Sequence, residues 1–198
     1  MTELDTEIAQ AAARLIAEEG MPWGSAKQRA LKDLGLPPRT ALPSHVAVED
    51  ALFEHLALFQ ADTQPGELRA LRETALRWMD RLADFEPQLT GAAWRGTANH
   101  LSDLHLLLYS DDPKAPEIAL INAGLSPEPG VQDRDERGHP LTTLALLVPC
   151  PALHQQVGLH LTVHDTRARR GSLLPDARGR SERGDCAALR ALLESTPS

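Results

Sequence analysis

The sequence is poor in cysteine and has no long apolar run. Its two cysteines, Cys150 and Cys186, show no Cys-x-x-Cys spacing, which argues against a disulfide framework or a zinc ribbon and favours reduced thiols. Apolar runs such as Leu144–Val148 are far too short to cross a bilayer. Residues 2–5 are acidic, where a secretory signal peptide needs positive charge. We therefore expect a cytoplasmic protein with no membrane partner.

Lysine is also scarce, and the formal net charge is −8. Because affinity for nucleic acid comes mainly from neutralising phosphates, this balance disfavours non-specific nucleic-acid binding. Residues 166–184 are nevertheless rich in arginine: Arg167, Arg169, Arg170, Arg178, Arg180 and Arg183. Arginine forks bind phosphate oxygens in pairs. This segment therefore either clamps a triphosphate or RNA backbone, or forms a solvated loop offset by nearby carboxylates.

The first half of the sequence predicts four helices. A first amphipathic pattern stops at Gly20, a natural helix end. A second opens with the S-x-x-Q spacing of a capping box at Ser25 and ends at Gly35. A third begins near Ser44, and a fourth spans about residues 65–85 with a continuous apolar stripe. We interpret these apolar residues as core packing.

After Pro87 the pattern changes to that of a small sheet. Residues 88–97 predict a strand that runs into a glycine-containing turn. Residues 103–109 and 158–165 alternate polar and apolar side chains, which is typical of half-buried strands. Two helices and a buried strand are expected at 116–123, 186–194 and 141–148.

These elements place the chain in the α+β class. An N-terminal helical half, residues 1–86, precedes a small mixed sheet with flanking helices, residues 87–198. The fourth helix is expected to pack directly on the sheet, so the two halves need not be independent domains. No internal repeat is present.

The stretch between Gly91 and Leu106 carries the residues best suited to chemistry. Glycines at 91 and 96 allow backbone N–H groups to approach a phosphate with no Cβ in the way. On the strand that follows, Asp103 and His105 stand at i and i+2, so their side chains share one face. Such a pair can hold a divalent cation against phosphates. This pattern suits phosphoryl or nucleotidyl transfer, in which catalysis is mostly positioning and charge neutralisation.

At these residues the chain resembles the polymerase-β-type, or minimal, nucleotidyltransferases. Their Gly-Ser, further Gly and Ser-Asp-x-Asp-Leu signature is matched here by Gly91, Gly96, Ser102, Asp103 and Leu106. The similarity covers roughly residues 82–124. It implies a nucleotidyltransferase-like fold, an NTP substrate, Mg²⁺ or Mn²⁺, and transfer of a nucleoside monophosphate to an acceptor such as a protein or RNA. The resemblance assigns catalysis to Asp103 and His105, and nucleotide binding to Gly91, Gly96 and Ser102. We expect Arg95, within the same turn, to help hold the nucleotide phosphate.

Two positions depart from that family. Ala92 stands where the family has a serine that contacts phosphate, and His105 replaces its second metal-binding aspartate. Magnesium prefers oxygen ligands. The departures therefore point either to another metal or to a protein that keeps the fold without catalysis, as a nucleotide-binding, RNA-binding or regulatory protein.

A histidine cluster is a further alternative. His160 and His164 share one face of the later predicted strand. If that strand lies beside residues 103–109, the polar faces would assemble a metal site from Asp103, His105, His160 and His164. Such a set suits Zn²⁺ or Fe²⁺. The same residues also fit a structural role, as hydrogen-bonded side chains on a half-buried sheet.

The helical half offers a rival to the nucleotidyltransferase interpretation. Residues 11–36 resemble the opening of a TetR-type DNA-binding domain, but Pro37 and Pro38 fall where its recognition helix should begin. Acidic side chains at Glu18, Glu19 and Asp33 are poorly placed to approach DNA. We expect no specific DNA binding, and interpret this half as a module that docks on the second half or mediates homodimerisation.

Overall fold

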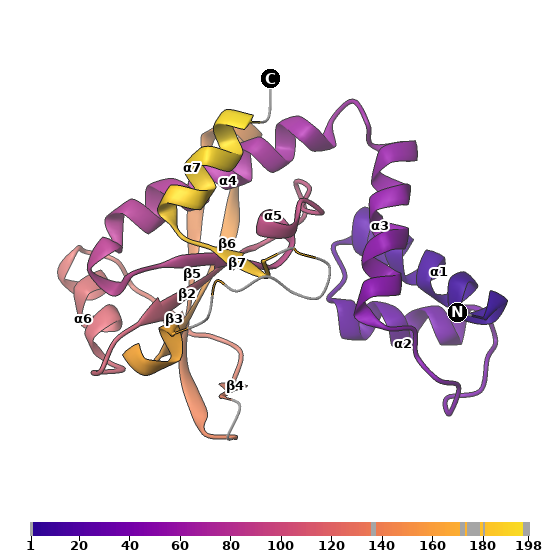
Figure 1. Cartoon of the computed structure of the whole chain (residues 1–198), viewed down its shortest axis with the longest axis horizontal. Coiled ribbons are helices and arrows are strands. Elements are labelled where there is room, and N and C mark those ends of the chain that lie inside the picture. The colour runs from indigo at the N-terminus through magenta and orange to yellow at the C-terminus, as the bar shows by residue number, and fades with distance from the viewer. Residues whose placement is uncertain (1, 136–137, 171–172, 174–178, 180, 196–198) are drawn as a thin grey trace. The chain divides into compact units, whose positions relative to one another are not determined.

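The computed structural model describes residues 2–135, 138–170, 173, 179 and 181–195 (Figure 1). These residues form a mixed α+β structure with seven α-helices and a seven-stranded sheet. The chain divides into two compact units, Met1–Pro65 and Gly66–Ser198. Our expected boundary at residue 86 lies inside the second unit, because the fourth helix packs with the sheet, as the sequence led us to expect. Within the described residues, no helix is long and apolar enough to cross a membrane.

The first unit is built from three helices: α1 (Glu3–Glu19), α2 (Trp23–Asp33) and α3 (His45–Phe59). Helix α1 ends at Gly20, whose φ of 63° allows the left-handed turn. Helix α3 begins after Ser44, whose Oγ accepts a hydrogen bond from the Ala47 N–H at 3.1 Å. The capping box predicted at Ser25 is wrong, because α2 already begins at Trp23 without a side-chain cap.

The second unit has alternating helices and strands: α4 (Gln64–Arg81), β1 (Gln88–Thr90), α5 (Gly91–Arg95), β2 (Leu104–Tyr109), α6 (Ala115–Asn122), β3 (Glu128–Pro129), β4 (Asp133–Arg134), β5 (Pro140–Cys150), β6 (Gln155–His164), β7 (Arg183–Gly184) and α7 (Cys186–Ser195). Short 3-10 segments cover Ala83–Phe85, Pro151–Leu153 and Thr166–Arg169. The strand order is β3-β5-β6-β2-β1-β7, with β4 paired to β5. Strands β2 and β6 run parallel, and every other described pair is antiparallel. The strand expected over 88–97 is wrong beyond Thr90, where α5 begins.

The two faces of the sheet differ in chemistry. One face is the core, where leucines and valines of β2, β5 and β6 pack with α4 and α7. These two helices lie side by side, joined by an Arg190 Nη2 to Asp80 Oδ1 bond of 2.5 Å (Figure 1). On the other face Thr90 lies opposite His105, and His105 lies opposite His160. The alternation predicted for residues 103–109 and 158–165 is therefore confirmed.

Candidate functional site

The parallel pairing of β2 with β6 creates a cluster of three polar side chains. His105 is the register partner of His160, and their rings stack with centroids 4.9 Å apart and planes inclined by 16°. The Asp103 carboxylate lies just before β2, and its Oδ2 is 3.0 Å from His160 Nε2. Three of the four side chains expected to converge therefore do so, although Asp103 and His160 are 57 residues apart.

Asp103 is held by both of its oxygens. Oδ1 accepts a hydrogen bond from the Gly158 N–H at 3.0 Å, while Oδ2 contacts His160. A hydrogen bond from His160 is the main reason that the pKa of Asp103 is lowered, and the Gly158 N–H contributes in the same direction. Glycine at position 158 makes room for the carboxylate, because a Cβ there would lie 2.5 Å from Oδ1. Asp103 is therefore an ionised carboxylate whose hydrogen bond orients the His160 ring.

The predicted glycine turn lies directly beside this cluster. Gly91 adopts a φ of +70°, and a Cβ there would be 3.6 Å from Cδ2 of His105. The short helix α5 that Gly91 begins is secured by the buried Arg72 of α4, which donates to the carbonyls of Ala93 (2.8 Å) and Trp94 (3.2 Å). Burial lowers the pKa of Arg72. Arg72 was not predicted from the sequence, because only a tertiary contact distinguishes it from other helix-surface arginines.

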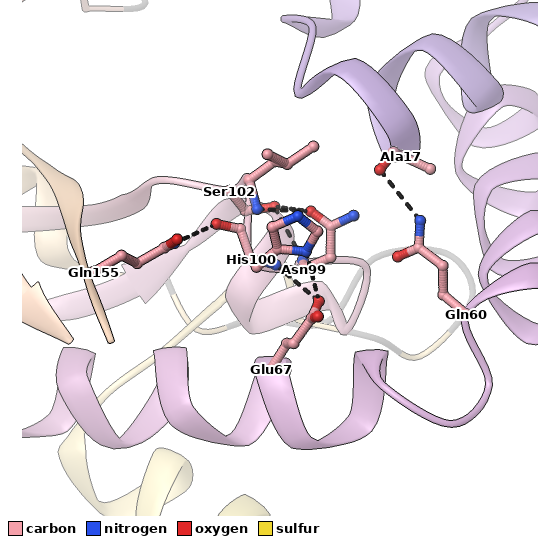
Figure 2. A network of polar contacts seen from close by, with 8 residues as sticks. Ala17, Gln60, Glu67, Asn99, His100, Ser102 and Gln155 are labelled. Carbon is pink, nitrogen blue, oxygen red and sulfur yellow. Dashed lines mark hydrogen bonds and ion pairs between the residues drawn. The ribbon is translucent and has the colours of Figure 1, made fainter. Parts of the chain in front are cut away.

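A polar network holds the loop that leads into β2. Figure 2 shows Glu67 of α4 accepting a hydrogen bond from the backbone N–H of His100 (2.9 Å) and contacting its Nδ1 (3.1 Å). Gln155, at the start of β6, donates to the His100 carbonyl at 2.5 Å. Ser102 Oγ accepts from the Asn99 N–H at 3.1 Å, which closes the loop on itself. The network holds the loop that places Asp103 immediately before β2.

The remaining predicted residues lie elsewhere in the second unit. His164 is four positions along β6 from His160, about 13 Å at the usual strand rise, and it contacts the Tyr109 ring at 5.9 Å between centroids. Gly96 ends α5 with a φ of 96°. Arg95 lines a cavity of about 490 Å³ with Trp94 and residues of α7.

The cluster itself lies on an open surface. Neither the Arg95 cavity nor a second cavity of about 320 Å³ is lined by Asp103, His105 or His160 in the described part of the chain. The side chains of Asp103 and His160 are 50% and 29% exposed. The cluster is a better candidate site than either cavity. Compared with the two cavities, only the cluster combines a carboxylate, two imidazoles and a glycine turn. A ligand there would lie across the sheet rather than inside the protein.

The donor set does not fit a pair of magnesium ions. It offers one carboxylate, whose two oxygens are already hydrogen-bonded, and two imidazoles, whereas Mg²⁺ prefers oxygen ligands. Across the residues that the structure describes, no three His, Cys, Asp or Glu side chains are grouped to hold a metal. Two-metal catalysis therefore does not suit these residues.

The pKa of His105 leads to a prediction about how the stability of the protein falls in acid. Part of its ring is exposed, yet enclosure by protein atoms lowers its pKa, and nearby His160 adds to this effect. The unfolded chain, with an ordinary pKa of about 6.5, then binds this proton more readily than the folded protein. As the pH falls below about 6.5, proton binding by His105 in the unfolded chain therefore lowers the free energy of unfolding. We expect His105→Gln to show a smaller loss between pH 7 and 5 in urea unfolding. An unchanged pH dependence would contradict this expectation.

Comparison with known proteins adds no family assignment. No protein-family model matches the chain, and no curated protein sequence matches it. Function is therefore argued from the geometry of the cluster and from the residues around it.

Proposed function

We propose that the second unit is a divergent nucleotidyltransferase-like domain that binds a nucleoside triphosphate on its open sheet face without two-metal transfer chemistry. The proposal rests on one observation: Asp103, His105 and His160 lie together on one face of the sheet, with Gly91 beside His105. The order of elements supports it. A helix precedes β1, the Gly91 turn follows, Asp103 immediately precedes β2, and β6 brings a third polar residue beside β2.

The replacement of carboxylates by histidines favours binding over turnover. Phosphoryl transfer depends on cations that neutralise charge developing on the phosphate oxygens. A site with a single, already hydrogen-bonded carboxylate holds such cations poorly. Neutral or protonated imidazoles can instead donate hydrogen bonds to phosphate oxygens directly. We therefore expect NTP binding that does not require Mg²⁺, and no release of pyrophosphate.

Thermal-shift measurements on the full chain test this proposal. With each of the four common NTPs at millimolar concentration, in EDTA or Mg²⁺, we expect a rise in melting temperature in both buffers for at least one nucleotide. A ligand present at ten times its Kd stabilises the folded state by about 1.4 kcal/mol, a shift of roughly 3–6 °C for a chain of this size class. The double variant His105→Ala/His160→Ala should lose the shift.

A matched control is His154→Asn. His154 is an exposed histidine at the turn between β5 and β6, with a φ of 53° that asparagine tolerates. This variant should keep the full ligand shift. No shift with any nucleotide for the wild type would remove the nucleotide proposal. Release of labelled pyrophosphate by the wild type, lost in Asp103→Ala, would show instead that transfer activity persists.

A further inference from the structure

Arg183 stands in the same row of the sheet as the candidate site. Across neighbouring strands, Arg183 pairs with Thr90, Thr90 pairs with His105, and His105 pairs with His160. Directly opposed residues on neighbouring strands point to the same face. Since neighbouring strands lie about 4.8 Å apart, the backbone of Arg183 is about 10 Å from that of His105. Its side chain therefore belongs to the open polar face, beyond Thr90.

The guanidinium of Arg183 is incompletely satisfied. Its Nε is buried and makes no hydrogen bond to any described residue. A buried donor without an acceptor costs roughly 1–3 kcal/mol, and such atoms in native proteins call for an explanation such as a functional role. The structure therefore keeps a cationic donor on this face at an energetic cost.

The charge of Arg183 acts along this face. Burial is the main cause of the lowered pKa of His164, and the positive charge of Arg183 is the next cause. The carboxylates of Asp133 and Asp135 act on His164 in the opposite direction. Arg183 thus acts electrostatically on His164, which lies on the same face of β6 as His160.

Three other arginines of segment 166–184 carry no such argument. Arg169 forms an ion pair with Glu86, and Arg178 and Arg180 lie outside the described residues. Near the cluster, both carboxylate oxygens of Asp103 already have hydrogen-bond partners, Gly158 and His160. Arg183 is the arginine that both borders the cluster and has a donor without an acceptor among the residues described.

We propose that Arg183 binds a phosphate group of the ligand on the open sheet face, beside His105 and His160. This inference rests on the proposed function, and it names the anion-binding residue of that site. The ligand class is a polyphosphate, of which inorganic pyrophosphate is the smallest probe. An arginine fork recognises phosphate oxygens in pairs, which a lysine does not reproduce.

Isothermal titration calorimetry of the full chain with pyrophosphate and with ATP tests the inference. For both ligands we expect Arg183→Gln to weaken binding at least tenfold and Arg183→Lys to weaken it less, because lysine keeps the charge but not the fork. Arg190→Gln is the matched control, because Arg190 pairs with Asp80 on the helical side of the sheet, and it should bind as the wild type does. Melting temperatures of the unliganded variants distinguish a binding role from a structural role, because a purely structural arginine would change stability and leave affinity unchanged.

Each outcome decides a different claim. If the wild type binds both ligands and Arg183→Gln binds them equally well, the Arg183 inference is overturned and the proposed function stands. If pyrophosphate binds in an Arg183-dependent way but no nucleotide binds, the inference stands as an anion site and the proposed function fails. If the wild type binds neither ligand, both are overturned.

Discussion

Replacing Gly158 with alanine should dismantle the candidate site while leaving the fold in place. The new Cβ would lie 2.5 Å from Oδ1 and 2.6 Å from Cγ of Asp103, so the carboxylate must move off the β6 backbone. Asp103 then loses its bonds to the Gly158 N–H and to His160. We expect NTP affinity to fall at least tenfold and unfolding free energy to fall by about 1–2 kcal/mol, as for other overpacked sites. Calorimetry and urea unfolding measure the two effects.

A second glycine provides the control for this result. A Cβ added to Gly66, in the first turn of α4, would meet no heavy atom within 4 Å, so Gly66→Ala should be neutral or stabilise the helix by up to about 1 kcal/mol. In an Asp103→Ala background, Gly158→Ala should cost little, because the obstructing carboxylate is gone. A Gly158→Ala protein that binds nucleotide as the wild type does would rule out Asp103 as a determinant of the site.

Of the glycine substitutions considered, Gly184→Ala should give the largest decrease in the free energy of unfolding. A Cβ at this position would lie 2.0 Å from Cη2 of Trp94, and 2.2 Å from Cζ3. The indole has little freedom to move, because its Nε1 donates to the Ser181 carbonyl at 2.9 Å. Since overpacking of a rigid contact typically costs about 1–3 kcal/mol and occasionally more, we expect a loss of about 3 kcal/mol. Tryptophan fluorescence during urea unfolding would report it.

The partner variant Trp94→Leu makes this expectation specific. On its own it creates a void and should destabilise the protein. Combined with Gly184→Ala it should recover part of the loss, so that the two changes are coupled in a double-mutant cycle. Strict additivity of the two losses would show that the indole does not lie against Gly184 as described.

Much of the site geometry could be predicted from local sequence, because side-chain alternation is a local property. The period of two in residues 103–109 places Asp103 and His105 on one face, and the same rule places His160 on a polar face of its own strand. What local sequence does not encode is that β2 and β6 are neighbours. That pairing depends on packing of the apolar faces of both strands against α4, and therefore on residues far away in the chain.

The errors in local structure also have a tertiary cause. Residues 88–97 have the pattern of one strand, yet the chain turns into α5 at Gly91, where Arg72 of a distant helix binds the carbonyls of Ala93 and Trp94. Local sequence shows Arg183 only as one of several basic residues. Its place in the row with His105 follows from the pairing of β7 with β1, which joins residues far apart in the chain.

The parallel pairing of β2 with β6 also determines when the site can exist during folding. The β5–β6 hairpin closes through a short turn at Pro151–Leu153, whereas joining Asp103 to His160 spans 57 residues, for which chain entropy is much less favourable. Contacts of such sequence separation form slowly. The Asp103–His160 hydrogen bond should therefore form only after the β5–β6 hairpin has paired with β2. Its formation would report a late step in the folding of the sheet. A nascent chain released before residue 160 would present Asp103 with no partner histidine.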